Sequence, residues 1–513
     1  MKKLLLLISS LLFTNCINNF DEINKNPYGV GDKELDRVTT GGNELLSLQK
    51  LVLPQQENSY QMCFDLFATG YAGYASQTKH FNDYPVYNPR TGWVDYVFDD
   101  TYPKIYTGYY KLRGLSKGDF NKPYFALATI YRVAITHWLT DTYGPLPYTK
   151  MQEGKKEIPY DTQRDLYLAM INDLKQASEA LSKIDPSDRQ YAPYDMVYEG
   201  DMSKWVKYAN SLLLRIAIRM SDVDATKAKE VAEYAIKHGV IETNSDNASL
   251  KTTDNSVFKM SSIWGDSRVG ADIANYMNAY KDPRREKYFT AVNSRTDENK
   301  FFGLRTGTFN TPEKAHYSLP NIQKDSPIVW LSAAEVSFLK AEGALKGWAM
   351  NGNPKDLYEK GIQLSFEQWG ATVGEYLNSE SQVNGFQDNL NPALNDNSFS
   401  SAITVKWDDA TTQDQKLAKI ITQKWIAMFP YGGQEAWAEW RRTGYPNLMP
   451  AKENNSGGII STVTQVEGKD TGGMRRLPFS RSEYKDNPAY ILQAVGYLKG
   501  PDTGATDLWW VKK

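Results

Sequence analysis

Apolar residues recur at helical spacing along much of the chain, and three segments show the pattern most clearly. Residues 123–140 begin with a proline and are apolar on nearly every side, which is typical of a buried helix. Residues 161–181 place apolar side chains three or four positions apart behind an N-cap at Asp161. Residues 202–220 repeat that spacing with aromatic and aliphatic side chains on one face. Each segment is predicted as a helix.

The remaining helical segments indicate how the chain is organised. The same criteria predict further helices over residues 332–347, 355–369, 415–429 and 434–442. Helices joined by short connections pack as antiparallel neighbours, so helix pairs are expected near residues 123–181, 202–240 and 332–369. The predicted fold is therefore mainly α, with tetratricopeptide-like helix pairs. Gly-, Asn-, Ser- and Thr-rich stretches interrupt the pairs, and loops of such length are functional or carry small structures of their own.

The first residues indicate export. Residues 1–15 have a short basic start and an apolar run of about ten residues, too short to span a bilayer, which needs about 20. Cys16 follows this run directly and resembles the lipidated cysteine of a bacterial lipobox, although Asn15 replaces the usual small residue before it. We predict a lipoprotein signal peptide over residues 1–15, lipidation of Cys16, a linker over 16–33 and one domain over 34–513.

Composition excludes several classes of function. With 59 Lys and Arg against 61 Asp and Glu, the formal net charge of −2 gives no electrostatic basis for binding nucleic acid. Two cysteines are too few for a disulfide framework. Together with only four histidines, they leave few ligands for a metal site. Aromatic residues are abundant, with 13 Trp, 33 Tyr and 19 Phe. The sequence indicates no cofactor and leaves open whether Ca²⁺ supports an Asp- and Asn-rich loop.

The sequence contains no recognisable catalytic motif, whether a nucleophile elbow, a zinc-protease helix or a phosphate-binding loop. Cys63 and His137 both lie in apolar surroundings, where a buried packing role is favoured over catalysis. Glu335 and Glu342 share a helix face, but seven residues place their backbones about 10.5 Å apart. Retaining glycosidases hold their carboxyl groups roughly 5–5.5 Å apart. Inter-helix bonding explains the pair better, although other acid pairs leave hydrolysis open.

Residues 434–446 are dense in Trp and Arg and have two interpretations. They could form an anion site or a stacking platform. Alternatively, Trp437 and Trp440 fill the core while Arg441 and Arg442 tie the helix end to neighbouring loops. We favour the second interpretation because both Trp residues lie on a short helix that a C-cap glycine terminates.

Several segments, in order along nearly the whole chain, resemble the SusD/RagB-like outer-membrane lipoproteins of Bacteroidetes, and most closely the branch called SusD-like type 2. The matching segments are residues 20–27, 140–148, 205–219, 282–285, 327–343, 435–446, 476–487 and 500–510. In the second segment, Tyr143-Gly144-Pro145-Leu146-Pro147-Tyr148 looks like the family's characteristic turn. In the segment 476–487, Phe479-Ser480 departs from the usual Tyr-Pro.

The resemblance implies a function as well as a fold. Members dock against a SusC-like TonB-dependent transporter and act as a lid that captures a nutrient, usually an oligosaccharide, without catalysis. The resemblance therefore implies a lipid-anchored protein of the outer membrane, exposed at the cell surface. Some members serve peptide import, so peptide capture is the nearer alternative and glycoside hydrolysis the more distant one.

Sugar binding requires exposed aromatic faces beside polar side chains, because sugar rings present apolar C–H faces framed by hydroxyls. Two polar stretches combine these features, residues 71–93 and residues 261–272. The resemblance also favours the first stretch, since the family often places sugar contacts in the loop after its early helices. The candidate ligand-binding residues are Tyr84, Tyr87, Asn88, Trp93, Trp264, Asp266 and Arg268.

Overall fold

The computed structural model of the chain describes residues 38–79, 83–293, 300–308, 313–462 and 472–512. The predicted signal peptide, the predicted lipidation site Cys16 and the predicted linker lie outside the described residues. Within the described part of the chain, no helix combines the length and apolar character needed to cross a membrane.

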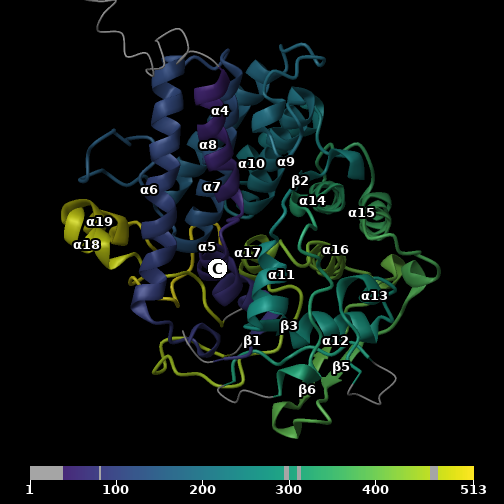
Figure 1. Ribbon diagram of the computed structural model, residues 1–513. Coiled ribbons are helices and arrows are strands. Elements are labelled where there is room, and N and C mark those ends of the chain that lie inside the picture. Colours follow the sequence, from purple (N-terminus) through teal and green to yellow (C-terminus); the bar gives the residue numbers. More distant parts are fainter. Residues whose placement is uncertain (1–37, 80–82, 294–299, 309–312, 463–471, 513) are drawn as a thin grey trace, which may run out of the picture.

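A layer of long helices forms the upper half of the molecule in Figure 1. It contains α4 (Val38–Val52), α6 (Thr91–Ser116), α7 (Pro123–Tyr143), α8 (Gln163–Leu181), α9 (Met202–Met220) and α10 (Ala225–His238). Neighbours in sequence are neighbours in space, since α7 packs on α8, α8 on α9 and α9 on α10, while α4 lies against α6 and α7. The layer continues into a second group of helices, namely α14 (Ala333–Leu345), α15 (Pro354–Gln368), α16 (Gln413–Ala427) and α17 (Gly433–Thr443).

The observed helices confirm the predicted fold class, a mainly α protein with helices packed in pairs. The helix α9 has the predicted bounds, and α7 begins at Pro123 as expected but continues to Tyr143. The predicted N-cap at Asp161 is wrong, because Thr162 caps α8 by accepting the Asp165 amide. The Asp161 carboxylate instead accepts the Tyr148 amide at 2.9 Å and holds the preceding turn.

Most of the short elements lie in the lower half of the molecule, although β2 lies beside α9 in the upper half and α18 and α19 lie at mid-height beside α6 (Figure 1). In the part of the chain that the structure describes, three antiparallel two-stranded sheets pair β1 (Ala75–Gln77) with β3 (Ser267–Val269), β2 (Ala248–Leu250) with β4 (Ile328–Leu331), and β5 (Val383–Phe386) with β6 (Asp396–Ser401). The short helices are α5 (Glu57–Tyr60), α11 (Ser256–Phe258), α12 (Ala271–Ala279), α13 (Arg285–Tyr288), α18 (Arg481–Asp486) and α19 (Pro488–Gly496). The π-helices η1 (Gln61–Thr69) and η5 (Lys259–Trp264) and the 3₁₀ turn η2 (Tyr84–Val86) carry residues of the candidate stretches or of the core beside them.

Buried ion pairs connect the helices through the centre of the molecule. Arg219 on α9 bonds Glu435 on α17 at 2.5 Å and Asp141 on α7 at 3.2 Å. Arg442 on α17 bonds Glu342 on α14 at 2.8 Å. Because these carboxylates and guanidinium groups are removed from water, loss of one member of a pair would leave its partner as an uncompensated buried charge. The network therefore fixes the relative positions of α7, α9, α14 and α17.

The end of the chain returns to this central network. Trp510 is fully buried and donates its indole N–H to Asp141 Oδ1 at 2.9 Å. The C-terminus accordingly lies near the middle of the view in Figure 1. One large hydrophobic cluster contains buried residues from α4 through to this segment, so the first and last described parts of the chain share a core.

Candidate functional site

The structure brings the two candidate stretches, residues 71–93 and 261–272, side by side. Strand β1 pairs antiparallel with β3, which aligns Ser76 with Arg268. Beyond the strands, the Thr78 amide donates to the Asp266 carbonyl at 2.9 Å. The Lys79 ammonium lies 3.1 Å from Asp266 Oδ1. Segments about 190 residues apart in sequence thus form one face of the molecule.

Tyr84 and Tyr87 are core residues, which corrects the expectation that both lie exposed in a polar loop. Tyr84 is 0% exposed and Tyr87 is 8% exposed. The 3₁₀ turn η2 is flanked by left-handed residues, Asp83 at φ 59° and Tyr87 at φ 61°, and the rings of Tyr84 and Tyr87 pack inward. Tyr84 lies 5.5 Å from Phe67 between ring centroids, and Tyr87 lies 6.1 Å from Tyr71. Burial raises the pKa of Tyr87 to about 12.

Asn88 and Trp93 differ from each other in their surroundings. Asn88 is exposed and lines a groove described below. Trp93 lies in the first turn of α6, half-buried against the main hydrophobic cluster. The expectation of a loop at residue 93 is therefore wrong, because the helix begins at Thr91.

The second stretch presents one partly exposed ring and one buried cation. Trp264 is half-buried at the end of η5, beside Ile263, which is 61% exposed. Arg268 is only 8% exposed and donates to backbone carbonyls, including that of Lys314 at 3.0 Å and that of Ser267 at 2.8 Å. Burial lowers its pKa. Arg268 therefore cross-links the backbone, while Trp264 remains available at the surface.

A groove of about 350 Å³ lies where the N-terminal end of α6 meets α18. We call it the α6–α18 groove, and its volume falls within the roughly 300–1,000 Å³ typical of small-ligand sites. Tyr484 presents the most exposed ring, at 38%, and its hydroxyl donates to Asp502 Oδ2 at 2.7 Å. Across the groove, Arg481 bonds Asp95 Oδ2 at 2.6 Å. Asn88 completes the polar lining.

The α6–α18 groove combines groups suited to binding a polar ring. An exposed aromatic face stacks on apolar C–H groups, and carboxylate, amide and guanidinium groups bond hydroxyls. Sequence reasoning missed Tyr484, Arg481, Asp95 and Asp502 as site residues. Residues 476–487 carry part of the family resemblance, but the local sequence does not show that this segment lines a groove.

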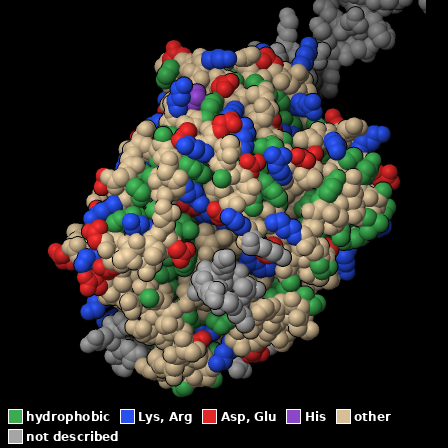
Figure 2. Space-filling model, turned by 180° about the vertical axis from the view of Figure 1, so that it is seen from behind, with side chains coloured by type: hydrophobic (Ala, Val, Ile, Leu, Met, Phe, Trp, Pro, Cys, Tyr) green, Lys and Arg blue, Asp and Glu red, His purple; other side chains and the backbone are tan. Residues whose placement is uncertain are grey.

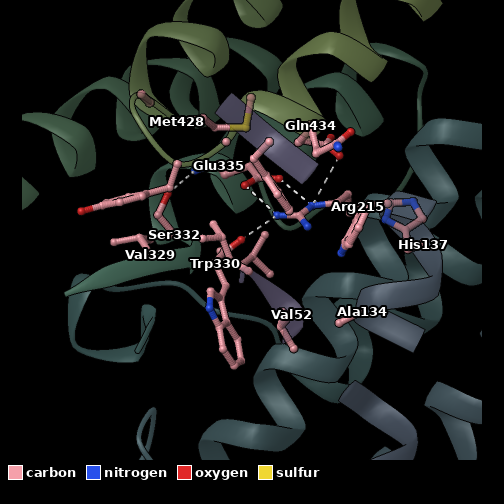
Figure 3. A pocket seen from close by; sticks show the side chains of 18 of the residues that line it. Val52, Ala134, His137, Arg215, Val329, Trp330, Ser332, Glu335, Met428 and Gln434 are labelled. Atoms are coloured by element: carbon pink, nitrogen blue, oxygen red, sulfur yellow. Dashed lines mark hydrogen bonds and ion pairs between the residues drawn. The ribbon is translucent and has the colours of Figure 1, made fainter. Parts of the chain in front are cut away.

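A second, more enclosed cavity lies between α7, α9 and α14 (Figure 3). Arg215 projects into it and donates to Glu335 Oε1 at 2.8 Å, to Glu335 Oε2 at 2.9 Å and to the Trp330 carbonyl at 3.1 Å. Burial raises the pKa of Glu335, which Arg215 opposes. His137 lies beside the cavity, and burial lowers its pKa. The cavity measures about 80 Å³, enough for a few water molecules but well below the typical size of a ligand site.

Contacts around this cavity also explain the paired acids noted in the sequence. Glu335 bonds Arg215, and Glu342 bonds Arg442 through both oxygens at 2.8 Å. Both carboxylates thus hold helices together, as inter-helix bonding predicts. The described residues contain no cluster of three or more candidate metal-ligating side chains.

The other sequence interpretations are confirmed by burial and contacts. Cys63 is fully buried, and desolvation raises its pKa to about 12, which suppresses the reactive thiolate. Trp437 and Trp440 are core residues, at 0% and 4% exposure. Arg441 donates to the carbonyls of Asp141 and Arg475 at 2.7 and 2.8 Å, so it ties the helix end to neighbouring segments.

Comparison with known proteins identifies similar chains and folds. The profile of the SusD-like family, described as Susd and RagB outer membrane lipoprotein, matches residues 22–511. A SusD homologue from Bacteroides thetaiotaomicron is 38% identical, covers 92% of this chain and 99% of its own, and superposes with a TM-score of 0.82. A SusD homologue from Bacteroides uniformis has the same identity and coverage, with a TM-score of 0.84.

The description of a third solved structure names the glycan that the protein binds. It is a chitin-binding SusD homologue from Flavobacterium johnsoniae, 33% identical, which covers 93% of this chain and 99% of its own with a TM-score of 0.84. A search of curated proteins gives no match.

Proposed function

This chain belongs to the SusD-like family of outer membrane lipoproteins, and from that premise we propose that it captures an oligosaccharide at the cell surface and delivers it to a SusC-like TonB-dependent transporter. In this proposal, Cys16 carries the lipid that anchors the protein to the outer membrane. Members of the family bind nutrients rather than convert them. The protein would accordingly bind its ligand without turnover.

The observation that carries the glycan assignment is the similarity to the chitin-binding homologue, which extends over nearly the full length of both chains. The mixed surface supports the same assignment. Figure 2 shows positive and negative side chains interspersed over the face that it views, with no extended basic region. Such a surface suits neutral, hydroxyl-rich ligands better than polyanions.

We place the principal sugar contact in the α6–α18 groove and a second contact at Trp264. Tyr484 supplies the stacking face in the groove, and Asn88, Asp95 and Asp502 supply hydroxyl partners. Trp264 offers a half-exposed ring on the face where the two candidate stretches meet. Tyr87 lines the groove but is only 8% exposed, and Tyr84 is fully buried, so we assign the stacking contact to Tyr484 rather than to either of them.

A glycan array with the soluble protein beginning at residue 17 tests the proposal. We expect saturable binding to an oligosaccharide class and no appearance of reducing ends during long incubation. Tyr484→Ala should weaken that binding at least tenfold, because it removes the stacking face. Tyr497→Ala is the matched control, since Tyr497 is 39% exposed against 38% for Tyr484 but does not line the groove.

Two further measurements separate this proposal from its alternatives. Tyr484→Phe keeps the ring and should retain most of the affinity, whereas a role of the hydroxyl alone predicts a loss as large as that of Tyr484→Ala. Co-purification with an outer-membrane barrel tests delivery to the transporter. Binding to a peptide library in the absence of glycan binding would contradict the glycan assignment and favour peptide capture.

A further inference from the structure

A second groove, lined by other residues than the α6–α18 groove, lies between α16 and the segments that precede β5 and follow β6. We call it the α16 groove, and its volume is about 530 Å³. One wall is formed by Ala402, Ile403 and Thr404, and the opposite wall by α16. Tyr445 and Ala418 belong to a small separate hydrophobic cluster beneath this region. The groove is therefore a distinct cavity with its own apolar support.

Lys419 on α16 is a buried cation that lines this groove. Its exposed fraction is 4%, and its ammonium donates to the Thr404 carbonyl at 2.9 Å and to the Thr404 hydroxyl. Among the described residues it forms no ion pair. The other two buried lysines of the described chain, Lys340 and Lys424, each have a carboxylate oxygen at 2.8 Å. Since a buried charge normally requires a paired counter-charge, Lys419 lacks the partner that its burial calls for.

The neighbouring carboxylates are already engaged. Glu380 pairs with Lys406 at 2.5 Å, and Asp409 lies 3.8 Å from the same ammonium. Asp409 also accepts the Thr404 hydroxyl at 3.0 Å, and its charge raises the pKa of Lys419 against the effect of burial without forming an ion pair with it. On the remaining side, Tyr445 donates to Asp414 at 2.6 Å. An anion that enters the groove would thus find Lys419 as its free counter-charge.

The rim of the groove adds amide groups. Gln382 and Gln415 are both exposed and line it. Gln415 Oε1 accepts the Thr411 and Thr412 amides in the capping box of α16, which leaves its amide N–H groups free of partners among the described residues. Amides of this kind bond hydroxyls, and Ile403 with Tyr445 supplies an apolar surface for C–H groups.

We propose that the α16 groove binds a small sugar acid, with its carboxylate on Lys419 and its hydroxyls on the glutamine rim. A carboxylate supplies the missing counter-charge, and a hydroxylated ring matches the polar rim and the apolar wall. The volume accommodates one or two rings. This site is independent of the α6–α18 groove, so Tyr484→Ala should leave it unaffected.

Titration of Lys419 gives the binding a defined pH dependence. Burial lowers its pKa to about 8, against the opposing influence of Asp409. The ammonium is protonated below that pH, so affinity for a carboxylate should be constant from about pH 5.5 to 7 and fall by up to about tenfold per pH unit above about pH 8. Bound carboxylate stabilises the ammonium and raises the pKa of Lys419 in the complex, so the decline continues until the pH reaches that higher pKa.

Isothermal titration of the soluble protein with D-glucuronate, D-glucose and acetate at pH 6.5 tests the proposal. We expect glucuronate to bind at least tenfold more tightly than glucose, which lacks the carboxylate, and than acetate, which lacks the ring. Equal affinities for glucuronate and glucose, or for glucuronate and acetate, would overturn the assignment of a sugar-acid site. Absence of glucuronate binding would overturn it entirely.

Variants of one helix provide the controls. Lys419→Met should lose at least tenfold in glucuronate affinity, while Lys416→Met, three residues earlier on α16, should not change it. Lys419→Arg keeps the charge at high pH and should therefore abolish the decline in affinity above pH 8. The pH profile of the unmodified protein does not depend on the folding of any variant, and a flat profile up to pH 10 would contradict the role of Lys419.

Discussion

Arg442 and Glu342 illustrate how single charged residues hold the helices of this protein in place. The guanidinium and the carboxylate have exposed side-chain fractions of 0% and 1%, and Arg442 also bonds Glu439 at 2.8 Å. Such a pair contributes little net stability compared with apolar residues of the same size, but loss of one member leaves a buried charge without its partner. The pair therefore favours the arrangement of α14 and α17 in which both charges are paired.

Arg442→Met should lower the free energy of unfolding by about 3–5 kcal/mol, because Glu342 and Glu439 lose their principal cation. Urea unfolding followed by circular dichroism measures the change. The double variant Arg442→Met/Glu342→Met should recover a substantial part of the loss, since it removes both charges at this contact. A double variant less stable than the single one would contradict this interpretation.

Asp65, on the π-helix η1, should make stability depend on pH. Burial raises its pKa from 3.8 to about 7, and its Oδ2 is buried without a hydrogen-bond partner among the described residues. The folded state holds this proton more tightly than the unfolded state does. Its stabilising contribution is therefore complete below about pH 4 and is lost as the pH rises to about 7.

Asp65→Asn should remove this dependence. Each pKa unit corresponds to about 1.4 kcal/mol, so we expect the variant to gain roughly 2–4 kcal/mol over the unmodified protein between pH 4 and pH 8. Unfolding curves recorded for both proteins across this range give the difference between their free energies of unfolding. Other titrating groups contribute equally to both proteins, so they do not affect this difference. A difference that stays constant with pH would rule out a raised pKa.

Sequence reasoning failed most clearly at Tyr84 and Tyr87. Their neighbours along the chain are polar, which favoured an exposed loop, but the left-handed residues that flank η2 turn both rings into the core. Backbone reversals of this kind depend on tertiary packing against Phe67 and Tyr71, which local sequence does not reveal. Local sequence does not identify Tyr484 either. Its ring is exposed in a groove that forms only where α6 and α18, distant in sequence, come together.

At the scale of elements, the contact between α14 and α15 depends on a glycine. A Cβ added at Gly361 on α15 would lie 2.8 Å from Cε1 of Phe338 on α14, closer than carbon atoms approach. Gly114 on α6 provides the opposite case, because a Cβ there would meet no atom within 4 Å. Two helical glycines thus have contrasting environments.

Gly361→Ala should destabilise the protein by about 1–3 kcal/mol, because the steric conflict with Phe338 exceeds the gain in helix propensity. Gly114→Ala should stabilise it by up to about 1 kcal/mol, since only the propensity changes. Thermal unfolding of both variants provides the comparison. Equal effects of the two substitutions would show that helix propensity alone governs both positions.

The accuracy of the sequence prediction also differed between elements. The helix α9 was predicted over its full extent because its apolar residues keep one face at regular spacing. The prediction did not single out α6, although it is 26 residues long. Pro103 and three glycines interrupt its pattern, and its first turn was assigned to a loop. Packing against α4 and α7 maintains α6 in spite of these residues.

At the scale of the whole molecule, one hydrophobic cluster extends from Leu45 to Val511. A shared core couples distant parts of the chain, so we expect thermal unfolding to occur in one cooperative transition. Circular dichroism, which reports helices, and tryptophan fluorescence, which reports the core, should give the same midpoint. Two separate midpoints would indicate independently folding parts and would contradict a single domain over residues 34–513.

The burial of Trp510 beside Asp141 has a consequence for biogenesis. A nascent chain cannot complete its central network before residue 510 has been synthesised, because Trp510 donates the indole N–H that this carboxylate accepts. Until then, Asp141 on α7 lacks a partner that lies 369 positions later in the sequence. Formation of the central network is therefore a late event, since it requires residues from distant parts of the chain to be present together.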